Sequence, residues 1–124
     1  MTLVCRGLRG ATTATANTKE AIREATREML EELVKANSLQ KDSIAAAIFT
    51  TTRDLNAEFP AVAARQMGWE HVALLDTHEM DVPDGLPSCI RTLVLVNTDK
   101  QANELVNIYL RGAVNLRSRG TEER

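Results

Sequence analysis

The chain has 124 residues, 44% of them hydrophobic and 26% charged, which predicts one soluble globular domain with a core of its own. Its net charge of −2, with no basic stripe, excludes a nucleic-acid partner, and no apolar run approaches the roughly 18 residues of a membrane span. No charged and then apolar leader precedes Cys5, so we expect a cytoplasmic protein.

Residue usage adds two expectations. Aromatic residues make up only 3% of the chain, so the core is thin and oligomerisation would support it. Eleven arginines against four lysines favour a protein that grips carboxylates or phosphates with planar guanidinium groups. Cys5 and Cys89 have no metal-type spacing and are expected to be free thiols in a reducing compartment.

The N-terminal third predicts a strand followed by a helix. Residues 2–8 form the expected strand. Asn17 stands three residues before Glu20, the spacing of a capping box, and predicts a helix that continues to about Ala36. Apolar side chains at steps of three and four predict its buried stripe: Ile22, Ala25, Met29, Leu33 and Ala36.

The middle of the chain predicts a strand and a short helix. Residues 43–52 end in β-forming residues and favour a buried strand, although their alanines also suit a helix. Residues 59–68 predict a helix, with Pro60 in its first turn and Gly68 as its stop.

The remaining pattern predicts two strands, a helix and a last short strand. Residues 71–75 and 91–98 are the two strands, and the continuous apolar run of the second predicts that it is fully buried. A helix is expected over 99–112, a strand over 113–117 and a disordered tail over 118–124.

Strands interleaved with helices predict a single α+β domain over residues 1–117, with helices packed on a mixed sheet. The loop from Asp76 to Cys89 is long for so small a domain, and loops of this length are usually either functional or mobile.

That loop carries an acidic cluster with several possible roles. Asp76, His78, Glu79 and Asp81 offer metal ligands, but a closed site would need others, and the only other histidine is His71. Glu79 is placed at a strand end, where a carboxylate can act on a ligand. The alternative, that these acids are only solvated, stays open and is the more common case.

The arginines are the other candidates for chemistry. Arg6 and Arg9 lie on opposite faces of a regular strand, and Arg9, beside Gly10, is better placed for a ligand. Arg91 opens the most buried strand and needs an anionic partner, which is either a ligand or an acid of its own loop. Arg65 and Arg117 are expected to be exposed by default, and a tyrosine such as Tyr109 is more often a core anchor whose hydroxyl finds a partner.

No nucleophile with a base, phosphate-cradling loop or dinucleotide motif is present, so the residues favour binding of a small polyanion. Four stretches in order, "RGLRGATT", "FPAVAARQMGW", "HEMDVPDGLPSCIR" and "YLRGAVNLR", resemble the small chorismate mutases of the AroH class. The resemblance spans about Leu3 to Arg117 and implies a trimer that forms a pseudo-α/β barrel, with active sites between subunits.

The resemblance also implies a reaction, the Claisen rearrangement of chorismate to prephenate, with no cofactor and no metal. Arg91, Glu79 and Arg9 are the implied catalytic residues. The implied substrate-binding residues are Arg9, Arg65, Tyr109, Arg117, Phe59, Ala61, Leu74, Asp76 and Leu116.

Two positions depart from the family pattern. Asp76 stands where some members carry a cysteine, and Val62 stands where some carry a lysine. These departures keep open a non-catalytic trimeric module that binds an aromatic-pathway carboxylate. A metal-dependent lyase or hydrolase centred on His78 and Glu79 is the third possibility.

Overall fold

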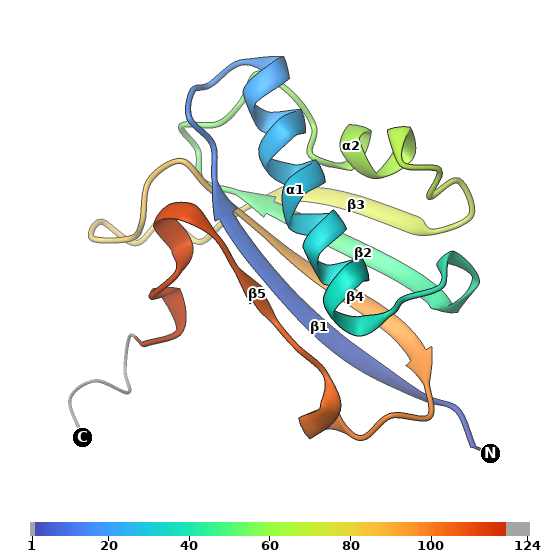
Figure 1. The fold of residues 1–124 in the computed structure, drawn as a ribbon. Coiled ribbons are helices and arrows are strands. Elements are labelled where there is room, and N and C mark those ends of the chain that lie inside the picture. The colour runs from blue at the N-terminus through green and yellow to red at the C-terminus, as the bar shows by residue number, and fades with distance from the viewer. Residues whose placement is uncertain (1, 119–124) are drawn as a thin grey trace.

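The computed structural model describes residues 2–118, which form a five-stranded sheet with two helices (Figure 1). In chain order the elements are β1 (Val4–Thr13), α1 (Lys19–Asn37), β2 (Ile44–Thr51), α2 (Ala61–Gln66), β3 (Ala73–His78), β4 (Cys89–Thr98) and β5 (Ile108–Tyr109). Short 3₁₀ turns lie at Lys41–Ser43, Ala102–Glu104, Arg111–Ala113 and Leu116–Ser118. Within residues 2–118 no helix is long and apolar enough to cross a membrane.

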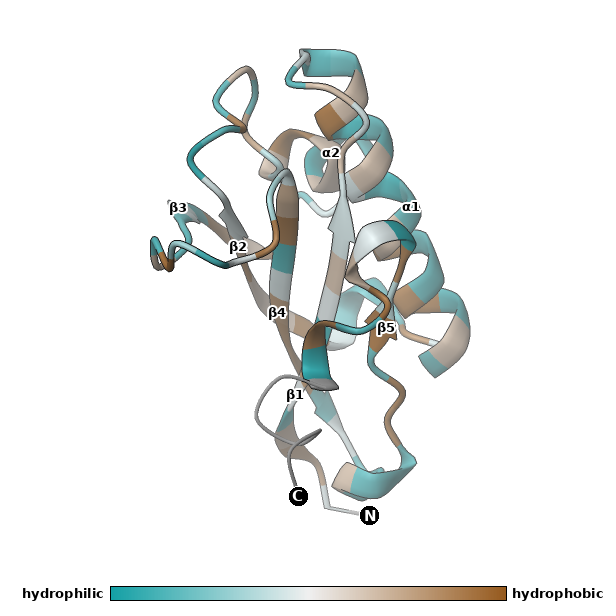
Figure 2. Cartoon of the chain, turned by 90° about the vertical axis from the view of Figure 1, so that its left-hand side faces the viewer, coloured by the Kyte–Doolittle hydropathy of each residue, from teal (hydrophilic) through white to brown (hydrophobic). Residues whose placement is uncertain are grey.

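The strand order is β3-β2-β4-β1-β5, and the sheet is mixed. β4 pairs antiparallel with both β1 and β2, whereas β3 and β5 add parallel strands at the two edges. Both helices pack on one face of the sheet (Figure 2). The expected α+β architecture is confirmed.

Because the helices cover only one face of the sheet, the strand residues fall into a buried and an exposed set. In β4, Ile90, Val94 and Val96 are buried under the helices, whereas Arg91 and Leu93 point to the other face and are exposed. This alternation is the period-two pattern of a sheet with one covered face. The other face of the described chain is therefore open.

α1 begins one residue later than its sequence pattern predicts. Thr18, not Asn17, is the N-cap, and its side-chain oxygen accepts from the backbone N–H of Ala21 at 3.1 Å. Asn17 instead accepts from the backbone N–H groups of Asn56 and Ala57. The predicted stripe is buried as far as Leu33, while Ala36 is exposed.

β1 is longer than expected, and its second half packs against α1. Gly10 faces the helix, and a Cβ there would lie 2.9 Å from Cδ1 of Leu33 and 3.1 Å from Cγ of Met29. Only a residue without a side chain allows this close approach of helix and strand. Gly10, which lies beyond the predicted end of this strand at residue 8, is therefore inside it.

The other central elements lie where expected, with small shifts at their ends, but β4 is not fully buried as predicted, because Arg91 and Leu93 lie on the open face and are exposed. β2 and β4 occupy the predicted segments, and α2 begins after Pro60 and is followed by Gly68 at a φ of +86°. β3 continues to His78, three residues beyond the predicted strand, so the long loop is shorter and spans residues 79–88.

The helix predicted over 99–112 is wrong. The segment contains the 3₁₀ turn Ala102–Glu104 and the two-residue strand β5, which pairs with β1. Asn37, at the end of α1, explains the difference: its side chain accepts from the N–H of Val106 at 2.8 Å and donates to the carbonyl of Val106 at 2.9 Å. Tertiary hydrogen bonds thus replace the helical ones, although the apolar spacing resembles a helix.

The strand predicted over 113–117 is also wrong, because 3₁₀ turns occupy this region. Arg111 adopts a φ of +52° and donates to Glu28 and to the carbonyl of Thr13. The N–H of Gly112 bonds to the hydroxyl of Thr13 at 3.1 Å, which fixes the turn against β1. Of the predicted disordered tail, Ser118 ends the last turn, and residues 119–124 lie outside the described residues.

We expect Asn37→Ala to lower the free energy of unfolding by about 2–3 kcal/mol, because it leaves both backbone groups of Val106 without their partner. Urea denaturation followed by circular dichroism measures the change. Asn103→Ala, at an exposed position, is the matched control and should shift stability by less than about 0.5 kcal/mol. Equal effects of the two substitutions would contradict the role of Asn37.

Candidate active site

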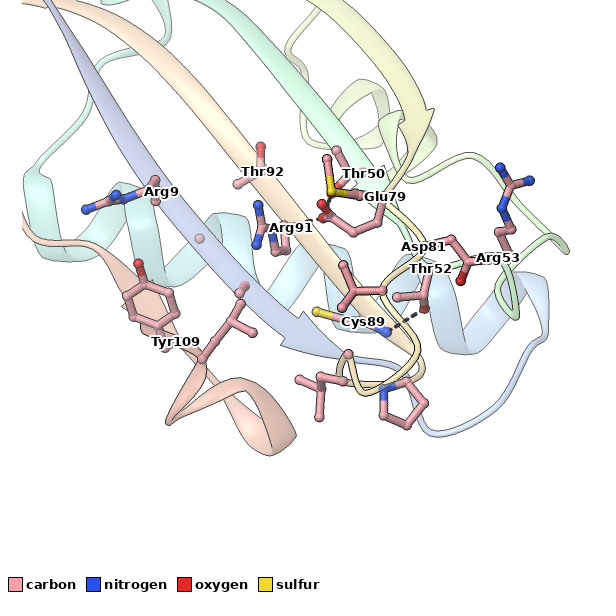
Figure 3. Close-up of a pocket in the computed structure, with 18 of the residues that line it drawn as sticks. Arg9, Thr50, Thr52, Arg53, Glu79, Asp81, Cys89, Arg91, Thr92 and Tyr109 are labelled. Atoms are coloured by element: carbon pink, nitrogen blue, oxygen red, sulfur yellow. Dashed lines mark hydrogen bonds and ion pairs between the residues drawn. The ribbon is translucent and has the colours of Figure 1, made fainter. Parts of the chain in front are cut away.

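A hollow of about 960 Å³ opens on the uncovered face of the sheet (Figure 3). Its floor comes from β1, β2 and β4, one wall from the loop 79–88, and the opposite wall from β5 and the C-terminal turns. Six of the predicted catalytic and substrate-binding residues line it: Arg9, Glu79, Arg91, Tyr109, Leu116 and Arg117.

Glu79 and Arg91 form an ion pair in the middle of this hollow. Oε2 of Glu79 lies 3.0 Å from Nε of Arg91, and the same oxygen accepts from the hydroxyl of Thr50 at 2.6 Å. The pair is only partly shielded, since the side chain of Arg91 is 48% exposed and that of Glu79 23%. The sequence left two possible anionic partners for Arg91, a ligand or an acid of its own loop. The structure shows the acid, Glu79, and a ligand can also reach Arg91 because its side chain is partly exposed.

Strand pairing explains why these groups meet. Arg91 in β4 is the antiparallel partner of Thr50 in β2 and of Ala11 in β1, so all three side chains face the open side. Glu79 directly follows β3, and its N–H bonds to the carbonyl of Thr51 at 2.8 Å. The C-terminal end of β3 thus places the carboxylate beside the first residues of β4 and the last residues of β2.

Arg9 and Tyr109 occupy the other end of the hollow. Arg9 is opposite Leu93 and faces the open side, while Arg6 is opposite Val96 on the helix side, as the sequence predicts. β5 places Tyr109 beside Ala11, and the side chain of Asn107 accepts from the N–H of Arg9 at 2.8 Å. The hydroxyl of Tyr109 is buried and has no hydrogen-bond partner among the described residues, so it is available to a ligand.

The other predicted binding residues do not line this hollow in the described chain. They lie at the β3 edge and around α2: Phe59, Ala61, Arg65, Leu74 and Asp76. Phe59 is 63% exposed and Arg65 is exposed, whereas Ala61 is buried. β3 and β5 are the two edges of the sheet, so one chain does not bring the two groups together.

Asp76 lies on the helix side of β3. Its Oδ1 accepts from the backbone N–H of Ala61, the first residue of α2, at 3.0 Å. Burial raises the pKa of this carboxyl, while the bond from Ala61 and the charge of Arg65 act in the opposite direction. In the single chain Asp76 therefore joins a strand to a helix.

The segment that leads into α2 is bound by α1 and by Asn17, which precedes that helix. Arg23 forms a short ion pair with Glu58, and Asn17 bonds to Asn56 and Ala57 through both ends of its amide. Phe59, which follows directly, is thus presented to solvent by an ordered segment.

The acidic cluster does not assemble a metal site within residues 2–118, where no three potential ligands are grouped. Nδ1 of His78 lies 3.3 Å from the carbonyl of Thr51, and Asp81 is exposed on the loop. The geometry gives no support to a metal-dependent lyase or hydrolase.

Sequence reading missed several groups of the hollow. The sequence does not identify Thr50, because its role depends on strand pairing with Arg91, which lies 41 residues later in the chain. Thr52 and Asp54 also line it, and the hydroxyl of Thr52 accepts from the N–H of Cys89 at 3.0 Å. Burial raises the pKa of the Cys89 thiol to about 11, in keeping with the free thiol that was expected.

We expect Asp76→Asn to increase the free energy of unfolding at pH 7. Because the pKa of Asp76 is higher in the folded than in the unfolded protein, where it is about 3.9, the folded protein becomes less stable as pH rises through these two pKa values. Asparagine keeps an oxygen for the N–H of Ala61 and carries no charge. The gain should disappear in urea denaturation below about pH 3.5; a pH-independent difference would contradict the argument.

Comparison with known proteins places this chain in a family. The model of the family "Chorismate mutase type I" matches residues 5–119. "Chorismate mutase AroH" of Thermus thermophilus is 50% identical over 113 residues, which are 90% of this chain and 93% of that protein. "Chorismate mutase AroH" of Bacillus subtilis (strain 168) is 37% identical over 116 residues, which are 93% of this chain and 91% of that protein.

A solved structure agrees with the sequence matches. A chorismate mutase from Clostridium thermocellum superposes with a TM-score of 0.86 at 46% identity, covering 87% of this chain and 96% of that one. With a family model over nearly the whole chain and relatives that cover nine-tenths of it, the chain belongs to the type I chorismate mutase family.

Proposed function

We propose that this protein converts chorismate to prephenate, on the route to the aromatic amino acids, at the hollow around Glu79 and Arg91. The observation that carries the proposal is one carboxylate and one guanidinium group paired in an open hollow, with Arg9 and an unpartnered tyrosine hydroxyl beside them. Family membership supports the same reaction.

The chemistry explains why no nucleophile is needed. In the rearrangement one C–O bond breaks while one C–C bond forms, both within the substrate. The ether oxygen gains negative charge in the transition state, and the ring fragment gains positive charge. An enzyme accelerates such a step by holding the dicarboxylate in a compact conformation and by placing fixed charges where charge develops.

We assign Arg91 to the ether oxygen and a substrate carboxylate. Its Nε is engaged by Glu79, but a guanidinium group carries four further N–H donors on its terminal nitrogens. Arg91 can therefore donate to the substrate without releasing Glu79. The ion pair restrains the guanidinium group before the substrate binds, which reduces the reorganisation needed during the reaction.

The remaining groups of the hollow receive supporting roles. Glu79 accepts from the ring hydroxyl and lies near the cationic fragment. Arg9 grips the side-chain carboxylate, and the hydroxyl of Tyr109 donates to it. Arg117 supplies positive potential, and Leu116 forms an apolar wall.

We further propose that the protein is a homotrimer whose sites lie between subunits. Phe59, Arg65 and the rest of the β3-edge group then belong to the site of a neighbouring copy. The open sheet face supports this arrangement, because Leu75 is 60% exposed and Leu93 40% exposed in the single chain. The same association would support the thin core. We also propose that the protein is located in the cytoplasm.

Incubation of the purified protein with chorismate should yield prephenate, and Arg91→Ala should lose at least about 3 kcal/mol of transition-state stabilisation. That loss is on the order of a hundredfold or more in rate, because a charged donor is removed from the developing oxyanion. Folded protein that binds chorismate in calorimetry without turnover would favour the non-catalytic module instead. A loss of only a few-fold in Arg91→Ala would mean that Arg91 is not the key donor.

Mixing of variants tests the shared site. Arg91→Ala and Arg65→Ala remove one group from each set, so each pure protein should have reduced activity. If subunits contribute one set each to a common site, co-refolding equal amounts should restore complete sites in about a quarter of the cases. Sedimentation should give a trimer throughout. Activity of the mixture equal to the mean of the two variants would contradict the composite site.

A further inference from the structure

Thr50 makes a contact with the candidate active site that the proposed roles do not use. Its hydroxyl donates to Oε2 of Glu79 at 2.6 Å, and Nε of Arg91 lies 3.0 Å from the same oxygen in an ion pair. One hydrogen bond and one ion pair thus converge on the same oxygen of the Glu79 carboxylate. Figure 3 shows Thr50 and Glu79 side by side in the hollow, with Arg91 close to them.

The backbone supports the same geometry. The N–H of Glu79 bonds to the carbonyl of Thr51, at 2.8 Å, while the side chain of Thr50 holds the carboxylate. Two consecutive residues of β2 therefore fix both ends of Glu79. β2 is a central strand, paired on one side with β3 and on the other with β4, so this support is rigid.

Convergence on Oε2 has a consequence for Oε1. No hydrogen bond to Oε1 is recorded among residues 2–118, so the lone pairs of this oxygen are the ones left for a ligand. A carboxylate held by one oxygen, on a residue whose backbone is fixed at the end of a strand, presents the other oxygen in one direction. The side chain of Glu79 is only 23% exposed, which limits the other rotamers it can adopt.

We infer that Thr50 is a positioning residue that orients the carboxylate of Glu79, so that Oε1 accepts the hydrogen bond of the substrate ring hydroxyl. The inference rests on the proposed function. Thr50 acts through Glu79 and does not itself contact the reacting atoms. Its hydroxyl selects which carboxylate oxygen meets the substrate and keeps the negative charge aligned with the cationic ring fragment.

Thr50→Val tests this role, because valine matches threonine in shape, favours strands and lacks the hydroxyl. We expect kcat to fall about tenfold with a smaller change in KM, since a hydrogen bond to a charged group is lost and the carboxylate becomes free to rotate. Thr50→Ser keeps the hydroxyl and should stay within about threefold of the unsubstituted protein. Equal losses in both variants would overturn the inference.

A double-mutant cycle separates positioning from packing. In a Glu79→Gln background, Thr50→Val should change kcat by less than about twofold, because the group that Thr50 orients is already altered. A substrate analogue without the ring hydroxyl should likewise abolish the difference between the unsubstituted protein and the Thr50→Val variant. A tenfold loss that persists in either case would show that Thr50 acts on stability or assembly and would overturn the inference.

The result can be distinguished from failure of the proposed function. Turnover of chorismate by the unsubstituted protein tests the function without reference to Thr50. If Thr50→Val does not fold, Thr50→Ala takes its place in the same cycle, with circular dichroism and sedimentation as checks. Activity in the unsubstituted protein with no effect of Thr50→Val would refute the positioning role alone.

Discussion

The antiparallel pairing of β4 with both of its neighbours is the constraint on which the rest of the structure depends. It sets Arg91 opposite Thr50 on one side and Ala11 on the other, all facing the open side of the sheet. A shift of one residue would turn Arg91 into the helix-covered core, where an arginine without a partner is costly. The apolar residues on the covered face, such as Val94 and Val96, make that shift unfavourable.

Much of the fold can be predicted from local sequence because hydrophobic spacing and capping act over a few residues. The central strands, α1 and α2 all follow such signals. The segment before β5 could not be predicted in this way, because the amide of Asn37 binds both backbone groups of Val106, a residue 69 positions away in the sequence. A hydrogen bond between residues so distant in sequence produces no periodic pattern of residues, and the apolar spacing of the segment by itself suggests a helix.

The candidate site shows the same division. Composition and strand positions point to Arg9, Arg91 and Glu79, and the family resemblance adds the rest of the predicted set. Neither source identifies Thr50, since its contact with Glu79 exists only after β2, β3 and β4 have paired. Asp76 illustrates a second limit: its face depends on β3 continuing past the predicted end, which directs the carboxylate to Ala61.

A reaction without proton transfer or a covalent intermediate requires fixed charge more than reactive groups, and a sheet provides it well. Strand residues such as Arg91 and Thr50 have backbones held on both sides, so their side chains lose little further freedom when a ligand binds. Glu79 lies one residue beyond a strand and depends on its contacts with β2 for the same order. The electrostatic field at the hollow is thus set by strand register, and a neutral substitution that disturbs the register would alter the chemistry as much as loss of a charge.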